Sequence, residues 1–144
     1  MFDSILVVCT GNICRSPIGE RILQQAFPEK IIKSAGTGAL VGQDADRQAY
    51  KVASQNGLSL DGHKGRQFTP SLSREYDLIL VMEKYHIEQI CKIAPEARGK
   101  ILLYGQWIGQ KDIPDPYRKS DEAFFSVYKL IEQASQGWIE KLST

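Results

Sequence analysis

The chain has 144 residues, 42% hydrophobic and 24% charged, with a formal net charge of +1. These values are typical of one globular domain, which we expect over residues 1–144. The near-neutral charge argues against nucleic acid as a partner, so any anion site must be local. No apolar run approaches the roughly 20 residues of a membrane span, so we expect a protein that is not membrane-embedded. No signal peptide is evident, and three cysteines, a small and odd number, argue for reduced thiols, so we expect the protein in the cytoplasm.

The first element is a strand that leads into a loop and a helix. Residues 5–8 form an apolar, β-branched run that is typical of a strand buried on both faces. Ser16 and Pro17 indicate a helix start, with the serine as cap and the proline in the first turn. Apolar residues then recur at helical spacing until Pro28.

The rest of the chain continues the alternation of strands and helices. We expect strands over residues 31–36, 77–82 and 100–104, and helices over residues 44–56, from 70, over 85–94 and from 120 to the C-terminal end. Four strands that alternate with helices predict an α/β fold: a single-domain, four-stranded parallel sheet flanked by helices on both faces. Residues 105–119 hold two prolines and no periodicity, and a loop of that length is typically functional.

The loop after the first strand has the composition of an anion site. It reads Cys9-Thr10-Gly11-Asn12-Ile13-Cys14-Arg15-Ser16. Ligands of parallel sheets bind at the carboxyl ends of the strands, where helix N-termini direct backbone N–H groups at an oxyanion. Gly11 and Asn12 both tolerate the positive φ that a tightly curled loop can require. The sequence therefore predicts that the 9–16 loop binds a phosphate group.

Cys9 and Arg15 supply the chemistry that such a loop needs. An electropositive loop at a helix N-terminus favours the thiolate, which is the nucleophilic form of cysteine. The planar arginine fork binds two phosphate oxygens at once. Ser16 follows directly, and its hydroxyl is placed to donate to the thiolate. The bland alternatives, a buried apolar Cys9 and a surface ion pair for Arg15, do not explain why both residues flank a glycine–asparagine turn.

Asp115 is the candidate general acid. Phosphoryl transfer requires a proton for the leaving oxygen, and prolines on both sides of Asp115 restrict the backbone that carries its carboxyl group. Tyr117 offers an aromatic wall for a flat substrate ring. The alternative is that the Asp-Pro pair only starts a turn.

The 9–16 loop, together with Asp115-Pro116-Tyr117, resembles the low-molecular-weight protein tyrosine phosphatase family, and the likeness extends over nearly the whole chain. The resemblance implies a phosphocysteine intermediate without metal or other cofactor. Residues 34–42 and 113–120 are similar to the bacterial branch that acts on tyrosine autokinases of capsule and exopolysaccharide export, so a tyrosine-phosphorylated protein of that kind is the implied partner. In that branch the wall opposite Tyr117 is a leucine, here Leu40.

Two other classes compete with this interpretation. An arsenate reductase on the same scaffold passes a disulfide along extra cysteines near residues 80–90, where this chain has Met82 and only Cys91. A phosphotyrosine-binding module without activity would need neither Cys9 nor Asp115. The sequence decides neither the physiological substrate nor the oligomeric state.

Several further residues carry weaker expectations. Cys14 either forms a protective disulfide with Cys9 or is a packed thiol without a role, and Cys91 is expected in the core. His63 and His86 belong to no recognisable pattern and are expected to be structural or exposed. Four basic residues either form a solvated surface or steer an acidic phosphorylated segment to the site. They are Lys64, Arg66, Arg118 and Lys119.

Overall fold

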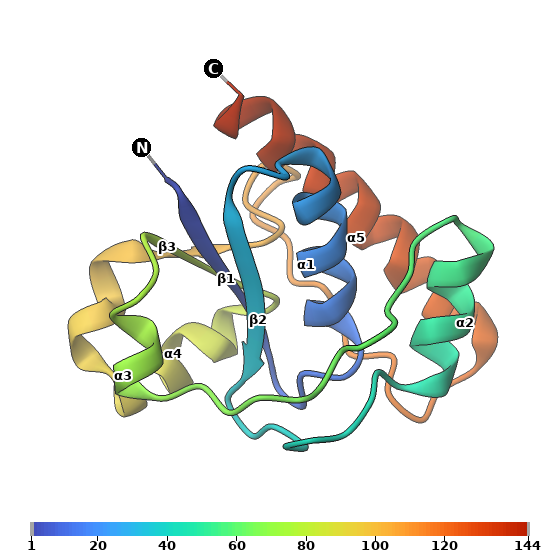
Figure 1. Cartoon of the computed structure of the whole chain (residues 1–144), viewed down its shortest axis with the longest axis horizontal. Helices are drawn as coiled ribbons and strands as arrows, with labels where there is room; N and C mark the ends of the chain where they lie inside the picture. The colour runs from blue at the N-terminus through green and yellow to red at the C-terminus, as the bar shows by residue number, and fades with distance from the viewer. Residues whose placement is uncertain (1, 144) are drawn as a thin grey trace.

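The computed structural model describes residues 2–143. It is a four-stranded parallel sheet with helices on both faces (Figure 1). The strand order is β2-β1-β3-β4, with bounds Ser4–Cys9 for β1, Ile31–Gly36 for β2, Leu78–Val81 for β3 and Ile101–Leu103 for β4. The helices are α1 (Arg15–Ala26), α2 (Arg47–Gln55), α3 (Pro70–Ser73), α4 (Lys84–Ile93) and α5 (Asp121–Leu142), with a 3₁₀ helix η1 over Pro95–Lys100. The predicted fold class is confirmed.

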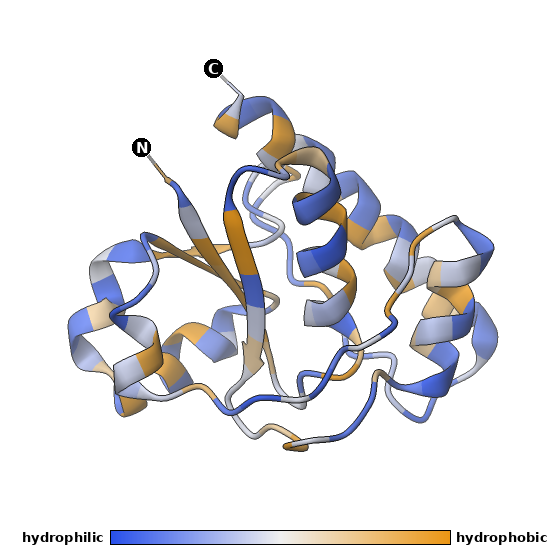
Figure 2. Cartoon of the chain, in the orientation of Figure 1, coloured by the Kyte–Doolittle hydropathy of each residue, from blue (hydrophilic) through white to orange (hydrophobic). Residues whose placement is uncertain are grey.

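The two faces of the sheet bury two separate apolar clusters. Along β1, Ile5 and Val7 belong to one cluster, and Leu6 and Val8 belong to the other. This alternation follows from the two-residue period of a strand, and it explains why the sequence shows an uninterrupted apolar run there. Helices α1, α2 and α5 cover the first face and α3 and α4 the second, and apolar residues concentrate in the strands between them (Figure 2). Among residues 2–143, no helix is long and apolar enough to cross a bilayer.

Helix starts show where local sequence rules held and where they failed. Thr69 caps α3 as predicted, because its hydroxyl accepts from the Leu72 N–H at 3.1 Å. The predicted cap at Ser16 is wrong, since α1 begins at Arg15 and Cys14 occupies the cap position without a side-chain hydrogen bond. The Ser16 hydroxyl instead lies against Cys9. Helix α2 also begins later than predicted, with Asp46 as its cap.

The end of β2 is packed directly against the start of the 9–16 loop. Gly36 pairs with Cys9 in the sheet, and a Cβ atom added to Gly36 would lie 2.3 Å from the backbone oxygen of Thr10. No backbone oxygen can approach a methyl group that closely, so a side chain at this position would displace the strand or the loop.

We therefore expect Gly36→Ala to destabilise the fold by about 1–3 kcal/mol, because the strand or the loop has to shift to make room for the methyl group. Gly99→Ala is the matched control, since a Cβ there would meet no atom within 4 Å. Urea unfolding of both variants measures the difference. Equal stability of the two would show that the contact at Gly36 is not tight in solution.

Candidate active site

Cys9 lies at the base of a pocket at the carboxyl edge of the sheet. It is the last residue of β1, and 2% of its surface is exposed. The pocket draws its walls from the 9–16 loop, the loop after β2 and the 105–119 loop, through Cys9, Thr10, Gly11, Ile13, Cys14, Arg15, Gly38, Leu40, Asp115 and Tyr117. Nine of the eleven site residues predicted from the sequence line this pocket. Asn12 donates to Ser16, and Ser16 contacts the Cys9 sulfur.

Hydrogen bonds to Asn12 hold the 9–16 loop in its curl. Asn12 has φ +58°, whereas Gly11 is not in the left-handed region, so only one of the two expected residues takes a positive φ. The backbone N–H of Arg66 donates to Asn12 Oδ1 at 2.8 Å, which fixes the orientation of the amide. Asn12 Nδ2 then donates to Ser16 Oγ at 2.8 Å. The Ser16 hydroxyl hydrogen is left for Cys9 Sγ, 2.9 Å away.

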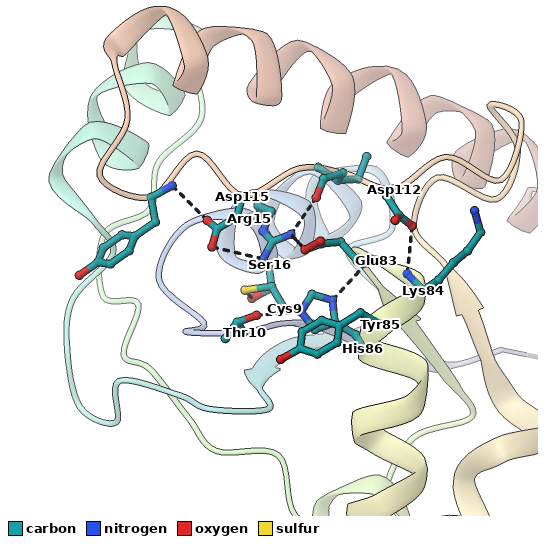
Figure 3. A network of polar contacts seen from close by, with 12 residues as sticks. Cys9, Thr10, Arg15, Ser16, Glu83, Lys84, Tyr85, His86, Asp112 and Asp115 are labelled. Atoms are coloured by element: carbon teal, nitrogen blue, oxygen red, sulfur yellow. Dashed lines mark hydrogen bonds and ion pairs between the residues drawn. The ribbon is translucent and has the colours of Figure 1, made fainter.

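The Arg15 guanidinium is buried and oriented by two oxygen acceptors. Its Nη1 donates to Glu83 Oε1 at 2.8 Å and to the Ile113 carbonyl at 2.7 Å (Figure 3). These two bonds use both hydrogens of Nη1. The Nε and Nη2 groups remain available, and they are the pair that can bind two oxygens of a phosphate side by side.

Asp115 is held over the pocket by the anchored part of the 105–119 loop. The Ile113 N–H donates to the Met82 carbonyl at 2.7 Å, and the Asp112 carboxylate accepts from the Lys84 N–H at the start of α4 at 2.9 Å. Asp115 Oδ1 accepts from the Tyr117 N–H at 3.0 Å, while Oδ2 lies 3.7 Å from Arg15 Nη2. The carboxyl group remains 45% exposed, so it can exchange a proton with solvent.

The upper walls of the pocket are apolar. Leu40 is fixed by a 3.0 Å hydrogen bond from its N–H to the Gly11 carbonyl, and Tyr117 is 37% exposed at the rim. The Arg118 guanidinium lies over the Tyr117 ring, 5.3 Å from the ring centroid. A flat apolar group can therefore pack between these side chains above a base that is rich in hydrogen-bond donors.

The cysteines differ in environment. Cys9, Cys14 and Cys91 are all free thiols. Burial, together with the Asp46 carboxylate, raises the pKa of Cys14 well above its usual range, so Cys14 is a neutral thiol. Cys91 is partly buried against the cluster on the opposite face of the sheet from the Cys9 cluster. Whether Cys9 and Cys14 join on oxidation stays a prediction.

Sequence analysis missed the polar residues that support the loop from distant segments. His63 Nε2 contacts the Asn12 carbonyl at 2.5 Å, and His86 Nε2 contacts Thr10 Oγ1 at 2.9 Å. Both histidines are buried, so of the two expected alternatives, structural or exposed, the structural one applies. Glu83 was missed entirely. Its signal was a carboxylate two positions beyond the buried strand β3, at the edge where the site lies.

Three of the four basic residues singled out in the sequence make separate contacts. Lys64 pairs with Asp44, and Arg66 donates to the Ser34 carbonyl at 3.4 Å. Arg118 lies on the Tyr117 ring, as described above. Among residues 2–143, no group of three or more histidine, cysteine, aspartate or glutamate side chains is arranged to hold a metal ion.

Comparisons with known proteins decide the family. Residues 4–144 match the profile described as low molecular weight phosphotyrosine protein phosphatase. This chain belongs to that family. It is a cysteine-dependent protein tyrosine phosphatase, as predicted. The low molecular weight protein-tyrosine-phosphatase Etp of Escherichia coli K12 is 58% identical over 142 residues, which cover 99% of this chain and 96% of that protein.

Two solved structures are similar over almost the full length. The tyrosine phosphatase Wzb from Escherichia coli K30, in complex with sulphate, has a TM-score of 0.97 and 65% identity, with 99% of both chains covered. Vibrio vulnificus Wzb, in complex with benzylphosphonate, has a TM-score of 0.96 and 56% identity, with 98% of this chain and 99% of that chain covered.

The Glu83–Arg15 pair gives a testable consequence of this geometry. Glu83→Ala removes the carboxylate that orients a buried guanidinium, and a misplacement of about 1 Å costs about 100-fold in rate. We expect a loss of that order in kcat/KM, and a smaller one for Glu83→Gln. Steady-state kinetics with an aryl phosphate and the inhibition constant of inorganic phosphate measure it.

Glu96→Ala is the matched control, because it removes an exposed ion pair with Arg74 far from the pocket. Unchanged kinetics and phosphate inhibition in Glu83→Ala would contradict a role for Glu83 in orienting Arg15.

Proposed function

We propose that this phosphatase hydrolyses phosphotyrosine through a phosphocysteine intermediate, with Cys9 as nucleophile, Arg15 as phosphate ligand and Asp115 as general acid. The observation that supports this most directly is that Cys9 and Arg15 of the 9–16 loop and Asp115 of the distant 105–119 loop line one pocket. The Cys9 thiolate attacks phosphorus while the bond to the phenolic oxygen breaks. Asp115 gives its proton to that oxygen.

The second half of the reaction uses the same groups. Asp115, now a carboxylate, takes a proton from water as the water attacks the phosphocysteine and releases inorganic phosphate. Cys9 leaves as a thiolate, and the Ser16 hydroxyl 2.9 Å from its sulfur stabilises the charge. Arg15 and the backbone N–H groups of the 9–16 loop bind the equatorial oxygens, where negative charge accumulates.

The arsenate reductase alternative has little geometric support. Its relay needs a second thiol that can reach Cys9 or Cys14 by successive exchange. Cys91, the other cysteine of this chain, is packed against the cluster on the far side of the sheet. The two Wzb structures are complexes with sulphate and with benzylphosphonate, and such oxyanions, one of them carrying an aromatic group, instead support a phosphatase that acts on an aryl ester.

We place the enzyme in the cytoplasm and propose a tyrosine autokinase of capsule or exopolysaccharide export as its partner. The similarity to Wzb and Etp, together with Leu40 and Tyr117 at the pocket rim, supports this assignment. A phosphorylated tyrosine on a flexible segment of such a kinase could enter between the two rim side chains.

The mechanism predicts different losses for two variants assayed on a phosphotyrosine peptide in the presence of a metal chelator. Cys9→Ser abolishes turnover, because a serine hydroxyl at this position lacks a general base. Asp115→Asn lowers kcat by about 100- to 10,000-fold, the usual contribution of a general acid. Rapid quenching with denaturant tests for phosphate bound to the protein in wild type. Full activity in Cys9→Ser would refute the nucleophile assignment.

Pocket depth predicts the choice of substrate. Cys9 is 2% exposed, and Leu40 and Tyr117 line the same pocket, so a phosphate at the end of a long flat side chain is best suited to reach the sulfur. We expect kcat/KM for a phosphotyrosine peptide to exceed that for the matched phosphoserine peptide by at least about 100-fold, since the shorter ester loses both reach and apolar contact. Comparable values for the two peptides would show that the rim does not select the substrate.

A further inference from the structure

A buried hydrogen-bond chain leads from α4 to the first side chain of the 9–16 loop. The backbone N–H of Glu83 lies 3.1 Å from His86 Nδ1, and His86 Nε2 lies 2.9 Å from Thr10 Oγ1 (Figure 3). His86 has no exposed surface, whereas Thr10 is half-buried and lines the pocket. The reaction described above assigns no task to either side chain.

The direction of each hydrogen bond follows from which atoms can donate. A backbone N–H only donates, so Nδ1 of His86 must be unprotonated and accept. Burial, together with the nearby Arg15 charge, lowers the pKa of His86 to about 4, so the ring is neutral at neutral pH. A neutral ring without a proton on Nδ1 carries it on Nε2. His86 therefore donates to Thr10 Oγ1, and the Thr10 hydroxyl hydrogen must point elsewhere.

The surroundings of Thr10 indicate where that hydrogen goes. A Cβ atom at Gly38 would lie 4.0 Å from the Thr10 methyl carbon, so the methyl group faces Gly38 while the hydroxyl faces His86. Among the described residues 2–143, no other polar atom forms a hydrogen bond with Thr10 Oγ1. The oxygen nevertheless belongs to a residue of the pocket wall, beside Cys9. A phosphoryl group bound there would bring the missing acceptor.

We propose that His86 is a positioning residue that fixes the Thr10 hydroxyl as an additional hydrogen-bond donor to the phosphoryl oxygens of the substrate. Histidine uses one of the two lone pairs of the hydroxyl oxygen and leaves the hydroxyl hydrogen free, so the hydroxyl meets the anion as a donor. The arrangement adds a side-chain donor to the backbone N–H groups of the loop, and it comes from the same helix start at which Glu83 orients Arg15. This inference rests on the proposed phosphotyrosine chemistry and names a further contact within it.

Kinetics of Thr10 variants on a phosphotyrosine peptide test the donor. Thr10→Val keeps the shape and removes the hydroxyl, and a hydrogen bond to a charged group is worth about 10- to 100-fold. We expect a loss of that size in kcat/KM and a similar weakening of inhibition by vanadate, with Thr10→Ser recovering most of both. Unchanged kinetics in Thr10→Val would overturn the proposal.

A double-mutant cycle separates positioning from simple structural support. If His86 acts through Thr10, His86→Phe lowers kcat/KM in the wild-type background and adds little in the Thr10→Val background. The same loss in both backgrounds would assign His86 a purely structural role and refute the proposal. Should His86→Phe not fold, ¹⁵N NMR of the wild-type His86 ring decides, since a proton on Nδ1 would equally refute it.

Two further readouts distinguish competing explanations. The rate of Cys9 alkylation as a function of pH reports thiolate formation, and we expect it to be the same in Thr10→Val and wild type. A shifted profile would mean that the hydroxyl donates to Cys9 instead of the substrate, which contradicts the proposal. If only the role of Thr10 and His86 is wrong, the wild type still hydrolyses phosphotyrosine and Cys9→Ser does not. If the proposed function is wrong, the wild type itself does not hydrolyse phosphotyrosine.

Discussion

The buried Arg15 guanidinium is the interaction on which the arrangement of the site depends. A charge with 2% of its surface exposed must be compensated inside the protein, because burial without partners costs several kcal/mol. Glu83 and the Ile113 carbonyl provide that compensation at 2.8 and 2.7 Å. They come from the start of α4 and from the 105–119 loop, so one side chain joins three segments that are far apart in the sequence. These two bonds do not use Nε or Nη2, the edge of the fork that we propose binds phosphate.

Backbone donors set the direction of the hydrogen bonds around this centre. One chain of bonds begins at a backbone N–H, passes through Asn12 and Ser16, and ends with a donor facing the Cys9 sulfur. A second begins at the Glu83 N–H and passes through His86 to the pocket wall. Because an N–H group cannot accept, each chain can be polarised in only one direction. Both chains therefore direct hydrogen atoms towards the pocket, where the proposed reaction develops negative charge.

Much of the fold and of the site was predictable because the relevant signals are local. A strand buried on both faces must be apolar at every position, so β1 and β3 were visible as continuous runs. Nearly all of the predicted pocket residues lie within the 9–16 loop or beside Asp115, where neighbours in sequence remain neighbours in space. The predicted helix cap at Ser16 was wrong because the Ser16 side chain has another partner. Its hydroxyl serves Cys9, a partner that capping rules do not consider.

The sequence alone thus determined the α/β class, the loop that carries Cys9 and Arg15, and the Asp115 segment, since short patterns specify strand ends, helix starts and turns. Only the tertiary structure decided which distant residues support them. Glu83 and His86 are separated from the 9–16 loop by about 70 residues, and their contacts exist because β3 pairs with β1 and brings the start of α4 beside that loop. A position just beyond a buried strand is a local signal for Glu83, but it does not specify Arg15 as the partner, and His86 carries no such signal. Their role arises from the packing of the sheet.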